Sequence, residues 1–364
     1  MRSTRDYRDD MKTYIVVITY NGEKDIQVFL ESLRGTVEEI SAKLIVVDNN
    51  STDGTCRVVE KVWPNAHLIR NTQNRGYAGA GNQGMQYAIE QGAEFVFLVN
   101  QDIIFEHGWL EPLLQEMKTH PQTAAVQPLI MLDPQRDRIN SCGNAFHVLG
   151  FGFTRGYQKT VLEYPCNQRK EISYCSGAAV LYRISTLKQI GLFDEEFFMY
   201  HEDTDIGWRM RSAGYQNIVI PAARVYHHYD FSRSIQKFYF MERNRYMILW
   251  KNYEFKTLVL LFPLFVMWEV GLLFYSILSL FIHPKQTLTI KEKLRAYGYF
   301  FSGKKILLLL EKRYATSKSR ILHDRALVPL FTSEIQFQDI DNPILRWVAN
   351  PITKAYISII RRFI

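Results

Sequence analysis

Cysteine is scarce in this sequence and sparsely placed. The four cysteines are Cys56, Cys142, Cys166 and Cys175, and none lies in a CxxC pair or at zinc-site spacing. This pattern argues against a disulfide framework and predicts buried free thiols in a reducing compartment. Internal repeats and long low-complexity runs are also absent, and 47% of the residues are hydrophobic, so we expect a well-cored globular protein rather than a disordered chain.

The N-terminus has no apolar segment of the kind found in secretory signal peptides. The first ten residues read MRSTRDYRDD, which is too polar for such a signal, and the apolar run that begins at Tyr14 is too short. We therefore expect residues 1–10 to form a flexible tail and the folded part of the chain to face the cytosol.

Apolar, β-branched runs alternate with helical patterns over the first hundred residues. The predicted strands are Tyr14–Thr19, Lys43–Val47, Ala66–Arg70 and Glu94–Val99, and the predicted helices are Ile26–Arg34, Cys56–Trp63 and Gly79–Gln91. This alternation predicts an α/β fold with a mostly parallel mixed sheet. Residues 121–175 read as irregular. We expect a sheet domain over residues 11–250 and a helical, basic and apolar region over residues 251–364.

Polar clusters follow three of the predicted strands at their carboxyl ends, where ligands of open α/β sheets bind. These clusters are Thr19-Tyr20-Asn21, the run from Asp48 to Asp53, and Asn100-Gln101-Asp102. Each cluster taken alone is also explained by a capped turn. Arg75-Gly76 with Gly79, Gly81 and Gly84 forms a glycine-rich loop whose backbone could approach a nucleotide closely. It lacks the GxGxxG arrangement after a strand, so a dinucleotide fingerprint is not supported.

An acidic segment, Gly191–Arg209, places carboxylates among aromatic residues. It reads GLFDEEFFMYHEDTDIGWR, and Glu202 and Asp203 lie at the predicted start of a helix. A carboxylate among aromatic side chains can have its pKa tuned for general-base chemistry. The strand predicted over Ile218–Val225 delivers His227 and His228 to a sheet edge. Asp102 and one of these histidines could together bind Mg²⁺ or Mn²⁺.

Several segments, in this order, resemble the motifs of family 2 glycosyltransferases. They are VVITYN, VVDNNSTDGT, NRGYAGAGNQG, LVNQD, SGAAVLYR, the acidic segment, VYHH and RNR. The likeness is to the bacterial rhamnosyltransferase-like and galactofuranosyltransferase-like branch, and it covers roughly residues 14–245. It implies a GT-A fold and an inverting, metal-dependent transfer from a nucleoside-diphosphate sugar. The acceptor would be a hydroxyl of a glycan or lipid-linked glycan in cell-surface polysaccharide synthesis.

The resemblance also implies roles for individual residues. Residues implied to bind the nucleotide sugar are Thr19, Tyr20, Asn21, Asp48, Asn50, Arg75, Gly76, Asn100 and Gln101. Asp203 matches the catalytic base, and Glu202, Trp208 and Arg209 would support the acceptor site. Asp102 matches the last aspartate of the DxD metal motif and His227 the metal-binding histidine. The motif departs from the family pattern, because Asn100 replaces its first carboxylate.

The C-terminal region is basic and contains one long apolar run. Residues 251–364 hold 17 Lys and Arg against 8 Asp and Glu, a net charge of +9. Within it, Leu258–Ile282 has a single charge, Glu269, and is long enough to span a bilayer. Basic residues flank the run on both sides, which favours a re-entrant or in-plane segment at the cytoplasmic face of the membrane. A true span, or a soluble core or dimer helix, remains an alternative.

Three other interpretations fit the sequence less well than a family 2 glycosyltransferase does. A nucleotidyltransferase usually carries a glycine-rich, basic loop directly after the first strand, and Thr19-Tyr20-Asn21-Gly22 lacks it. An inactive sugar-nucleotide-binding protein is disfavoured because Asp102, Asp203 and His227 are present together. A nucleic-acid partner is disfavoured because no basic stripe is interleaved with stacking aromatics. We make no prediction of the donor sugar or the oligomeric state.

Overall fold

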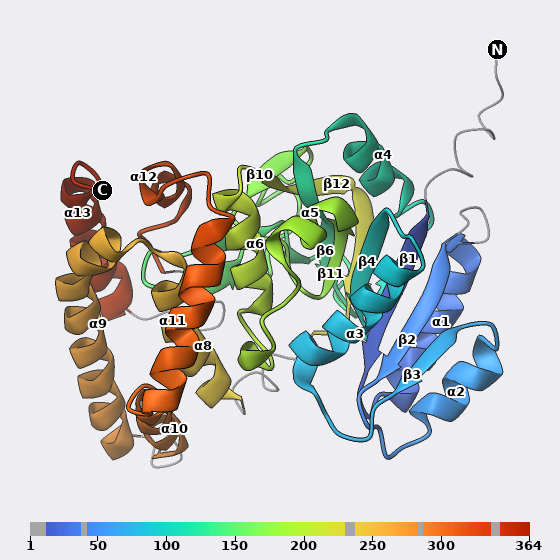
Figure 1. The fold of residues 1–364 in the computed structure, drawn as a ribbon, viewed down its shortest axis with the longest axis horizontal. Coiled ribbons are helices and arrows are strands. Elements are labelled where there is room, and N and C mark those ends of the chain that lie inside the picture. Colours follow the sequence, from blue (N-terminus) through green and yellow to red (C-terminus); the bar gives the residue numbers. More distant parts are fainter. Residues whose placement is uncertain (1–11, 38–41, 230–236, 283–286, 336–342) are drawn as a thin grey trace. The chain divides into compact units, whose positions relative to one another are not determined.

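The computed structural model describes residues 12–37, 42–229, 237–282, 287–335 and 343–364 (Figure 1). These residues form two compact units. Of the described residues, the first unit comprises 12–37, 42–144, 154–210 and 215–229, and the second comprises 145–153, 211–214, 237–282, 287–335 and 343–364. The predicted tail over residues 1–10 lies outside the described residues, and the predicted domain boundary at residue 250 stays a prediction.

A ten-stranded mixed sheet forms the frame of the first unit. Its strands are β1 (Thr13–Thr19), β2 (Lys43–Asp48), β3 (His67–Arg70), β4 (Phe95–Asn100), β5 (Ile103–Phe105), β6 (Thr123–Leu132), β7 (Ile139–Ser141), β10 (Lys170–Ile172), β11 (Ala179–Arg183) and β12 (Gln216–His227). The strand order is β10-β12-β6-β11-β4-β1-β2-β3, with β5 paired to β12 and β7 paired to β6. β1 is parallel to β2 and β4, β2 is parallel to β3, and β11 is antiparallel to β4. The α/β class with a mixed, partly parallel sheet is therefore confirmed.

Helices cover both faces of this sheet. They are α1 (Glu23–Val37), α2 (Thr55–Val62), α3 (Gly76–Glu90), α4 (Glu111–Thr119), α5 (Ile184–Ile190) and α6 (Glu202–Ser212). Alternate residues of β1 point to opposite faces, as strand geometry requires. Ile15 and Val17 belong to the core cluster with Ile26 and Phe29 of α1. Val16 faces α3, where a Cβ on Gly84 would lie 2.2 Å from its side chain.

One central strand was not predicted. β6 is a ten-residue, wholly buried strand between β12 and β11, inside the stretch that the sequence predicts to be irregular. Its sequence, TAAVQPLIML, is interrupted by Gln127 and Pro128, which weakens the strand pattern. The buried amide of Gln127 is satisfied, because its Oε1 accepts a hydrogen bond from Ser176 N and its Nε2 donates to Ser141 Oγ. A polar residue in a strand core is tolerated when it has such partners.

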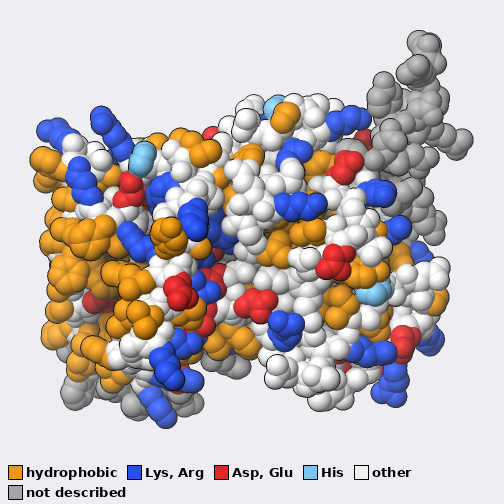
Figure 2. All heavy atoms as spheres, in the orientation of Figure 1, with side chains coloured by type: hydrophobic (Ala, Val, Ile, Leu, Met, Phe, Trp, Pro, Cys, Tyr) orange, Lys and Arg blue, Asp and Glu red, His pale blue; other side chains and the backbone are white. Residues whose placement is uncertain are grey.

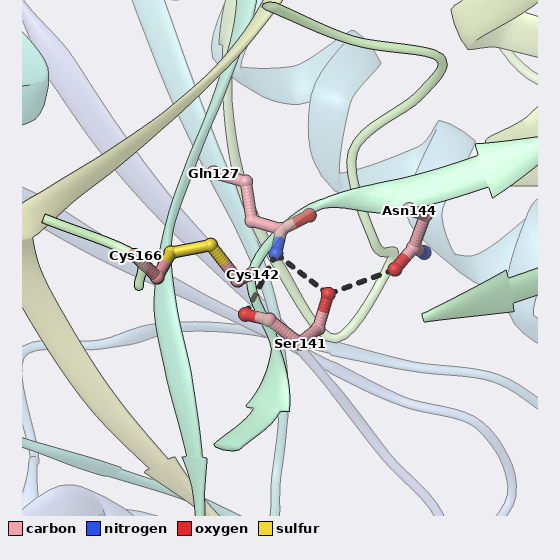
Figure 3. The surroundings of a disulfide bond; sticks show 5 residues. All are labelled: Gln127, Ser141, Cys142, Asn144 and Cys166. Carbon is pink, nitrogen blue, oxygen red and sulfur yellow. Dashed lines mark hydrogen bonds between the residues drawn. A yellow bond between two sulfur atoms is a disulfide. The ribbon is translucent and has the colours of Figure 1, made fainter. Parts of the chain in front are cut away.

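The prediction that the cysteines are free is wrong for two of the four. Cys142 and Cys166 form a disulfide with Cα atoms 6.3 Å apart, while Cys56 and Cys175 are free (Figure 3). Cys142 and Cys166 are brought together because the chain that follows β7 folds back on this strand. Cys142 N donates to Arg155 O, and Ile139 N donates to Lys159 O. Sequence spacing carries no sign of this return.

The described elements of the second unit are helical, apart from most of β8 (Asn144–Phe146) and β9 (Gly152–Thr154), which pair as a two-stranded sheet. Its helices are α8 (Phe238–Asn252), α9 (Phe255–Ile282), α10 (Thr287–Tyr299), α11 (Gly303–Lys318), α12 (Asp324–Leu327) and α13 (Asn350–Ile360), with a 3-10 turn at Val328–Leu330 and a π-helical turn at Leu345–Ala349. Among the described helices, α9 alone is long and apolar enough to cross a bilayer, by length and composition, over Phe255–Phe274.

A buried ion cluster joins three of these helices. It consists of Glu242 and Arg245 of α8, Glu269 of α9 and Lys293 of α10, all at most 8% exposed. Arg245 Nη2 lies 3.0 Å from Glu242 and 2.5 Å from Glu269, and Lys293 Nζ lies 2.6 Å and 2.9 Å from the same two carboxylates. Burial alone would raise the pKa of Glu242, but the charges of Arg245 and Lys293 outweigh it and lower the pKa to about 2.

We predict that Lys293→Met lowers the free energy of unfolding by about 3–5 kcal/mol, because it leaves two buried carboxylates with one cation. Lys291→Met, at an exposed position of the same helix, is the matched control and should change it by less than about 0.5 kcal/mol. Urea unfolding followed by tryptophan fluorescence measures both. In the wild type, the contribution of Glu242 is full above its ordinary pKa of 4.5 and is lost as the pH falls toward 2. Equal stability of the two variants would contradict the prediction.

Candidate active site

Strand register brings the first two polar clusters together. Thr19 is the partner of Asp48 across β1 and β2, and Asn100 is the partner of Ile18 across β1 and β4. Thr19 Oγ1 donates to Asp48 Oδ1 at 3.1 Å, and Ser51 N donates to Asp48 Oδ2 at 3.0 Å. Each carboxylate oxygen keeps a second acceptor site, so the buried Asp48 can still accept a hydrogen bond from a nucleobase N–H.

The loops after β1, β2 and β4 are tied to one another by side chains. Tyr20 N donates to Gln101 Oε1 at 3.0 Å, and Gln101 Nε2 donates back to Tyr20 O at 3.3 Å. Asn21 Oδ1 accepts from Thr52 N at 2.8 Å. Asn21 and Asn50 have φ of 45° and 72°, a region that asparagine tolerates better than most residues. The Tyr20 side chain is exposed (48%), so its ring is free to stack on a base.

Asn49 organises this edge and was not among the predicted site residues. It is buried, its Nδ2 donates to Asn74 Oδ1 at 3.0 Å and to Gly76 O at 3.1 Å, and its Oδ1 accepts from Arg75 N at 2.8 Å. The amide therefore holds the loop that begins α3. The run Asp48-Asn49-Asn50 marks this strand end as polar, but it does not reveal which of the three side chains points inward.

The glycine-rich helix α3 packs closely against protein. Gly76 has φ of +70°, and a Cβ at this position would lie 2.3 Å from the carbonyl oxygen of Phe198. A Cβ on Gly81 would lie 3.2 Å from the ring of Phe193. Ala78 N donates to the Phe198 carbonyl at 3.1 Å, and Arg75 pairs with Glu195 at 3.1 Å. These glycines therefore let α3 dock on the acidic segment.

The acid pair lies at the start of α6, where the helix N-terminus favours negative charge. Asp203 Oδ2 accepts from Gly177 N at 3.1 Å, and its Oδ1 accepts from Thr204 N at 2.7 Å and from Thr204 Oγ1 at 3.2 Å. Burial raises the pKa of Asp203, and these hydrogen bonds oppose the rise. Burial and then the charge of Asp203 raise the pKa of Glu202 well above its ordinary value.

Burial raises the pKa of both carboxyls, and the hydrogen bonds that Asp203 accepts make it the stronger acid of the pair. Within the described part of the chain, Glu202 Oε2 has no hydrogen-bond partner, whereas both oxygens of Asp203 do. Hydrogen bonds to a carboxylate favour its charged form. Of the two carboxyls, Asp203 is therefore the one whose charged form is stabilised by hydrogen bonds.

Tyr77 connects the acid pair with the strand ends and was also missed. Its hydroxyl donates to the carbonyl of Gly177, whose own N–H donates to Asp203. Burial raises the pKa of Tyr77 well above its ordinary value, and the charges of Glu202, Asp203 and Asp102 add to the rise. The phenol therefore lies within electrostatic range of all three carboxyls. Tyr77 stands inside the recognised motif NRGYAGAGNQG, where only Arg75 and Gly76 were assigned.

The structure pairs Asp102 with His227 rather than with His228. His227 Nε2 lies 3.2 Å from Asp102 Oδ1, and His227 is 5% exposed. His227 Nδ1 lies 3.1 Å from Asn140 Oδ1, an amide oxygen that can only accept, so Nδ1 carries the hydrogen and Nε2 presents its lone pair. The side chain of His228 is 58% exposed, with its Nδ1 4.0 Å from Asp25.

This pair fits a divalent cation that takes its remaining ligands from a substrate. A lone pair and a carboxylate oxygen that face each other at 3.2 Å need a cation between them, which is either a proton or a metal ion. Among the residues that the structure describes, no three His, Cys, Asp or Glu side chains are grouped to bind a metal. Mg²⁺ sites that use one or two protein ligands complete their shell with waters and phosphate oxygens.

Trp208 and Arg209 are buried in α6. Arg209 Nε donates to Asp205 Oδ2 at 2.8 Å, and its other nitrogens donate to the carbonyls of Ile190, Gly191 and Leu192 at 2.7–3.0 Å. The guanidinium therefore fixes the beginning of the acidic segment to α6. The acceptor-site role of both residues stays a prediction, which the geometry supports only through this positioning.

The sequence is similar to known glycosyltransferases. Residues 14–191 match the family Glycosyl transferase family 2. The chain is 30% identical over 235 residues to the N-acetylglucosaminyl-diphospho-decaprenol L-rhamnosyltransferase of Mycobacterium tuberculosis, which covers 59% of this chain and 75% of that protein. It is 26% identical over 259 residues to the dTDP-rhamnosyl transferase RfbF of Shigella flexneri, covering 66% and 80% respectively.

Among solved structures, the fold is similar to that of GalNAc-T7 determined with UDP, GalNAc and Mn²⁺. The TM-score is 0.54 at 14% sequence identity, and the match covers 68% of this chain and 49% of that one. This likeness concerns the fold alone. The predicted GT-A fold is thereby confirmed.

We predict that Gly76→Ala disrupts the docking of α3 on the acidic segment. Gly92→Ala is the matched control, since Gly92 has φ of +75° but only Lys12 Nζ, at 3.9 Å, near its added Cβ. The control should cost about 1–2 kcal/mol for the left-handed backbone alone. Gly76→Ala should cost more, because the Phe198 backbone must also move. Urea unfolding measures both, and equal losses would contradict the prediction.

Proposed function

Since the chain belongs to glycosyl transferase family 2, we propose that it transfers a sugar, of the rhamnose class, from a nucleoside diphosphate to a hydroxyl of a lipid-linked glycan. The family and its enzyme activity rest on the match over residues 14–191 and on the rhamnosyltransferase relatives. The observation that supports the mechanism is the position of Asp203, whose carboxylate accepts a hydrogen bond from Gly177 N, while Gly177 O accepts one from Tyr77. The charges of Glu202, Asp203 and Asp102 all add to the rise in the pKa of Tyr77 that burial causes. The names of the relatives support a deoxyhexose donor and a polyprenyl-linked acceptor.

In the proposed reaction Asp203 acts as the general base. The acceptor hydroxyl gives its proton to Asp203 as its oxygen forms a bond to the anomeric carbon of the donor. The bond between that carbon and the diphosphate oxygen breaks in the same displacement, so the anomeric centre is inverted. The raised pKa of Asp203 makes it a stronger base than an ordinary aspartate.

The donor would lie across the carboxyl ends of β1, β2 and β4. Asp48 would accept from the nucleobase, and the exposed ring of Tyr20 would stack on it. The loop amides held by Asn49 and Gln101 keep this edge in shape before the donor arrives. Such preorganisation lowers the ordering cost of binding.

Asp102 and His227 would hold Mg²⁺ or Mn²⁺ together with oxygens of the diphosphate. The bound cation would neutralise charge that develops on the departing diphosphate. Asn140 would keep His227 in the tautomer that binds metal, and the 3.2 Å separation of the two ligands supports the assignment. Asn100, which replaces the first carboxylate of the motif, leaves the site with one negative protein ligand.

A lipid-linked acceptor would place the enzyme at the cytoplasmic face of the membrane, where sugar nucleotides are available. The basic C-terminal region and the apolar helix α9 support this location. Neither a nucleotidyltransferase nor an inactive binding protein accounts as well for the presence of the hydrogen-bonded Asp203 together with the Asp102–His227 pair.

Asp203→Asn should reduce kcat/KM by about 10²- to 10⁴-fold, since an amide cannot accept the proton. The assay follows transfer from dTDP-rhamnose and other nucleotide sugars. Asp137→Asn, an exposed position, is the control and should retain wild-type activity. Because the pKa of Asp203 is raised, wild-type kcat/KM should fall on the acid side with an apparent pKa above 3.8. Near-normal turnover of Asp203→Asn would overturn the assignment.

His227→Ala should weaken Mn²⁺ binding in the presence of a nucleoside diphosphate by at least tenfold, as removal of one of two protein ligands implies. His228→Ala should leave it within twofold of the wild type, because its side chain points toward solvent. Electron paramagnetic resonance of free Mn²⁺ measures both affinities. The reverse ranking would show that His228 is the ligand.

A further inference from the structure

Helix α9 exposes one continuous apolar stripe. Its members recur every three or four positions and are 41–68% exposed: Phe255, Val259, Phe262, Val266, Val270, Phe274 and Ile277. This spacing puts them on one face of the helix. From Phe255 to Ile277 the stripe runs for about 33 Å at 1.5 Å per residue. An exposed apolar surface of this length marks a contact with a membrane or another protein.

The opposite face of α9 is fixed to its own unit. Leu261, Leu264 and Trp268 are buried. Trp268 Nε1 donates to Thr353 Oγ1 of α13 at 2.7 Å, and Tyr356 OH of α13 donates to Leu260 O at 2.8 Å. The helix therefore presents the same face to the outside for as long as the second unit is folded.

The buried ion cluster argues against α9 crossing a bilayer. Glu269 lies midway along the helix and binds Arg245 of α8 and Lys293 of α10. A crossing helix would either leave these two cations behind, with Glu269 unpaired in hydrocarbon, or carry α8 and α10 in with it. Unpaired charges in a bilayer core are costly, and α8 has the polar sequence MERNR in its middle.

The positive charge of this region favours an anionic lipid leaflet as the partner of the apolar stripe. Residues 251–364 carry a net charge of +9, so a second copy of the chain would meet like charge at this face. Exposed basic side chains accompany the apolar ones in this unit: Lys256, Lys304, Lys318, Lys354, Arg361 and Arg362. Figure 2 shows hydrophobic side chains gathered over α9, with Lys and Arg above and below them in that view. An anionic lipid leaflet complements both features.

We propose that the stripe of α9 lies in the plane of an anionic lipid leaflet, immersed to the depth of its own side chains, and that the second unit thereby binds the membrane without crossing it. The purpose of this membrane contact, to bring the active site to a membrane-bound acceptor, rests on the proposed function. The contact itself rests on the exposure, spacing and charge of the side chains.

The first test is flotation of the full chain with vesicles of phosphatidylcholine and phosphatidylglycerol at 7:3. Phe262→Glu combined with Val270→Glu should weaken binding at least tenfold. Leu162→Glu, at a 93% exposed apolar position of the first unit, is the matched control and should bind as the wild type does. Binding of the wild type should also drop at least tenfold on pure phosphatidylcholine. Unchanged flotation of the double variant, or equal binding to both vesicles, would overturn the proposal.

A second measurement distinguishes a helix that lies in the leaflet from a helix that spans the bilayer. Protein bound to intact vesicles should release a C-terminal tag to added protease and should leave the membrane in alkaline carbonate. A protected tag or resistance to carbonate would show a spanning helix instead. Sedimentation velocity of the double variant and the wild type should give the same mass, whereas a dimer lost in the variant would show a second copy as the occupant.

Hydrolysis of the sugar nucleotide without vesicles distinguishes this proposal from the proposed function. The double variant should retain wild-type hydrolysis, because none of its changes lies in the first unit. Full flotation with no sugar transfer on any donor would refute the proposed function alone. Lost flotation of the wild type with intact hydrolysis would refute the membrane proposal alone.

Discussion

The contact between the backbone at Gly76 and the backbone at Phe198 is the constraint on which the site depends. No side chain fits between them, and Ala78 N–H binds the Phe198 carbonyl. This contact holds the acidic segment against α3. Asn49 and Arg75 stabilise the same contact. Asn49 Oδ1 accepts a hydrogen bond from Arg75 N, and the Arg75 side chain pairs with Glu195 of the acidic segment. Asp203 is then placed by Gly177, which Tyr77 binds in turn.

Burial is the largest cause of the raised pKa values of Glu202 and Asp203. The hydrogen-bond donors of Gly177 and Thr204 favour the charged form of Asp203. The second unit solves the same problem differently. There Glu242 and Glu269 are both ionised, because Arg245 and Lys293 lie between them. Burial without a paired cation raises the pKa of Glu202 in the site, whereas the paired cations lower the pKa of Glu242 and Glu269 in the helical unit.

Much of this site could be predicted from the sequence. The strand ends at Thr19, Asp48 and Asn100 were readable because buried parallel strands give continuous apolar runs followed by polar residues. Asp203 as the base and Asp102 with His227 as metal ligands came from motif resemblance. The structure places the His227 and Asp102 side chains 3.2 Å apart, and both roles stay predictions. Strand β6 was missed because Gln127 and Pro128 break its apolar run, and their compatibility with a buried strand depends on distant partners.

Other features depend on contacts that one sequence does not encode locally. The Cys142–Cys166 disulfide forms only because the chain doubles back on β7, and 24 residues of separation give no hint of it. Asn49 and Tyr77 act through backbone groups, which have no sequence signature. The glycines of α3 were interpreted as space for a nucleotide, whereas the space they leave is filled by Phe193, Phe198 and Val16. The apolar run of α9 could be predicted from the sequence. Which face of this helix is exposed depends on its contacts within the second unit, among them the ion cluster.

The proposed reaction is a single displacement at the anomeric carbon, with Asp203 as the base and no covalent intermediate. The configuration of the product tests it, read from the one-bond carbon–proton coupling at the new glycosidic linkage by nuclear magnetic resonance. Inversion relative to the nucleotide-sugar donor is the expected result. Retention of configuration would contradict it, because retention requires a second displacement.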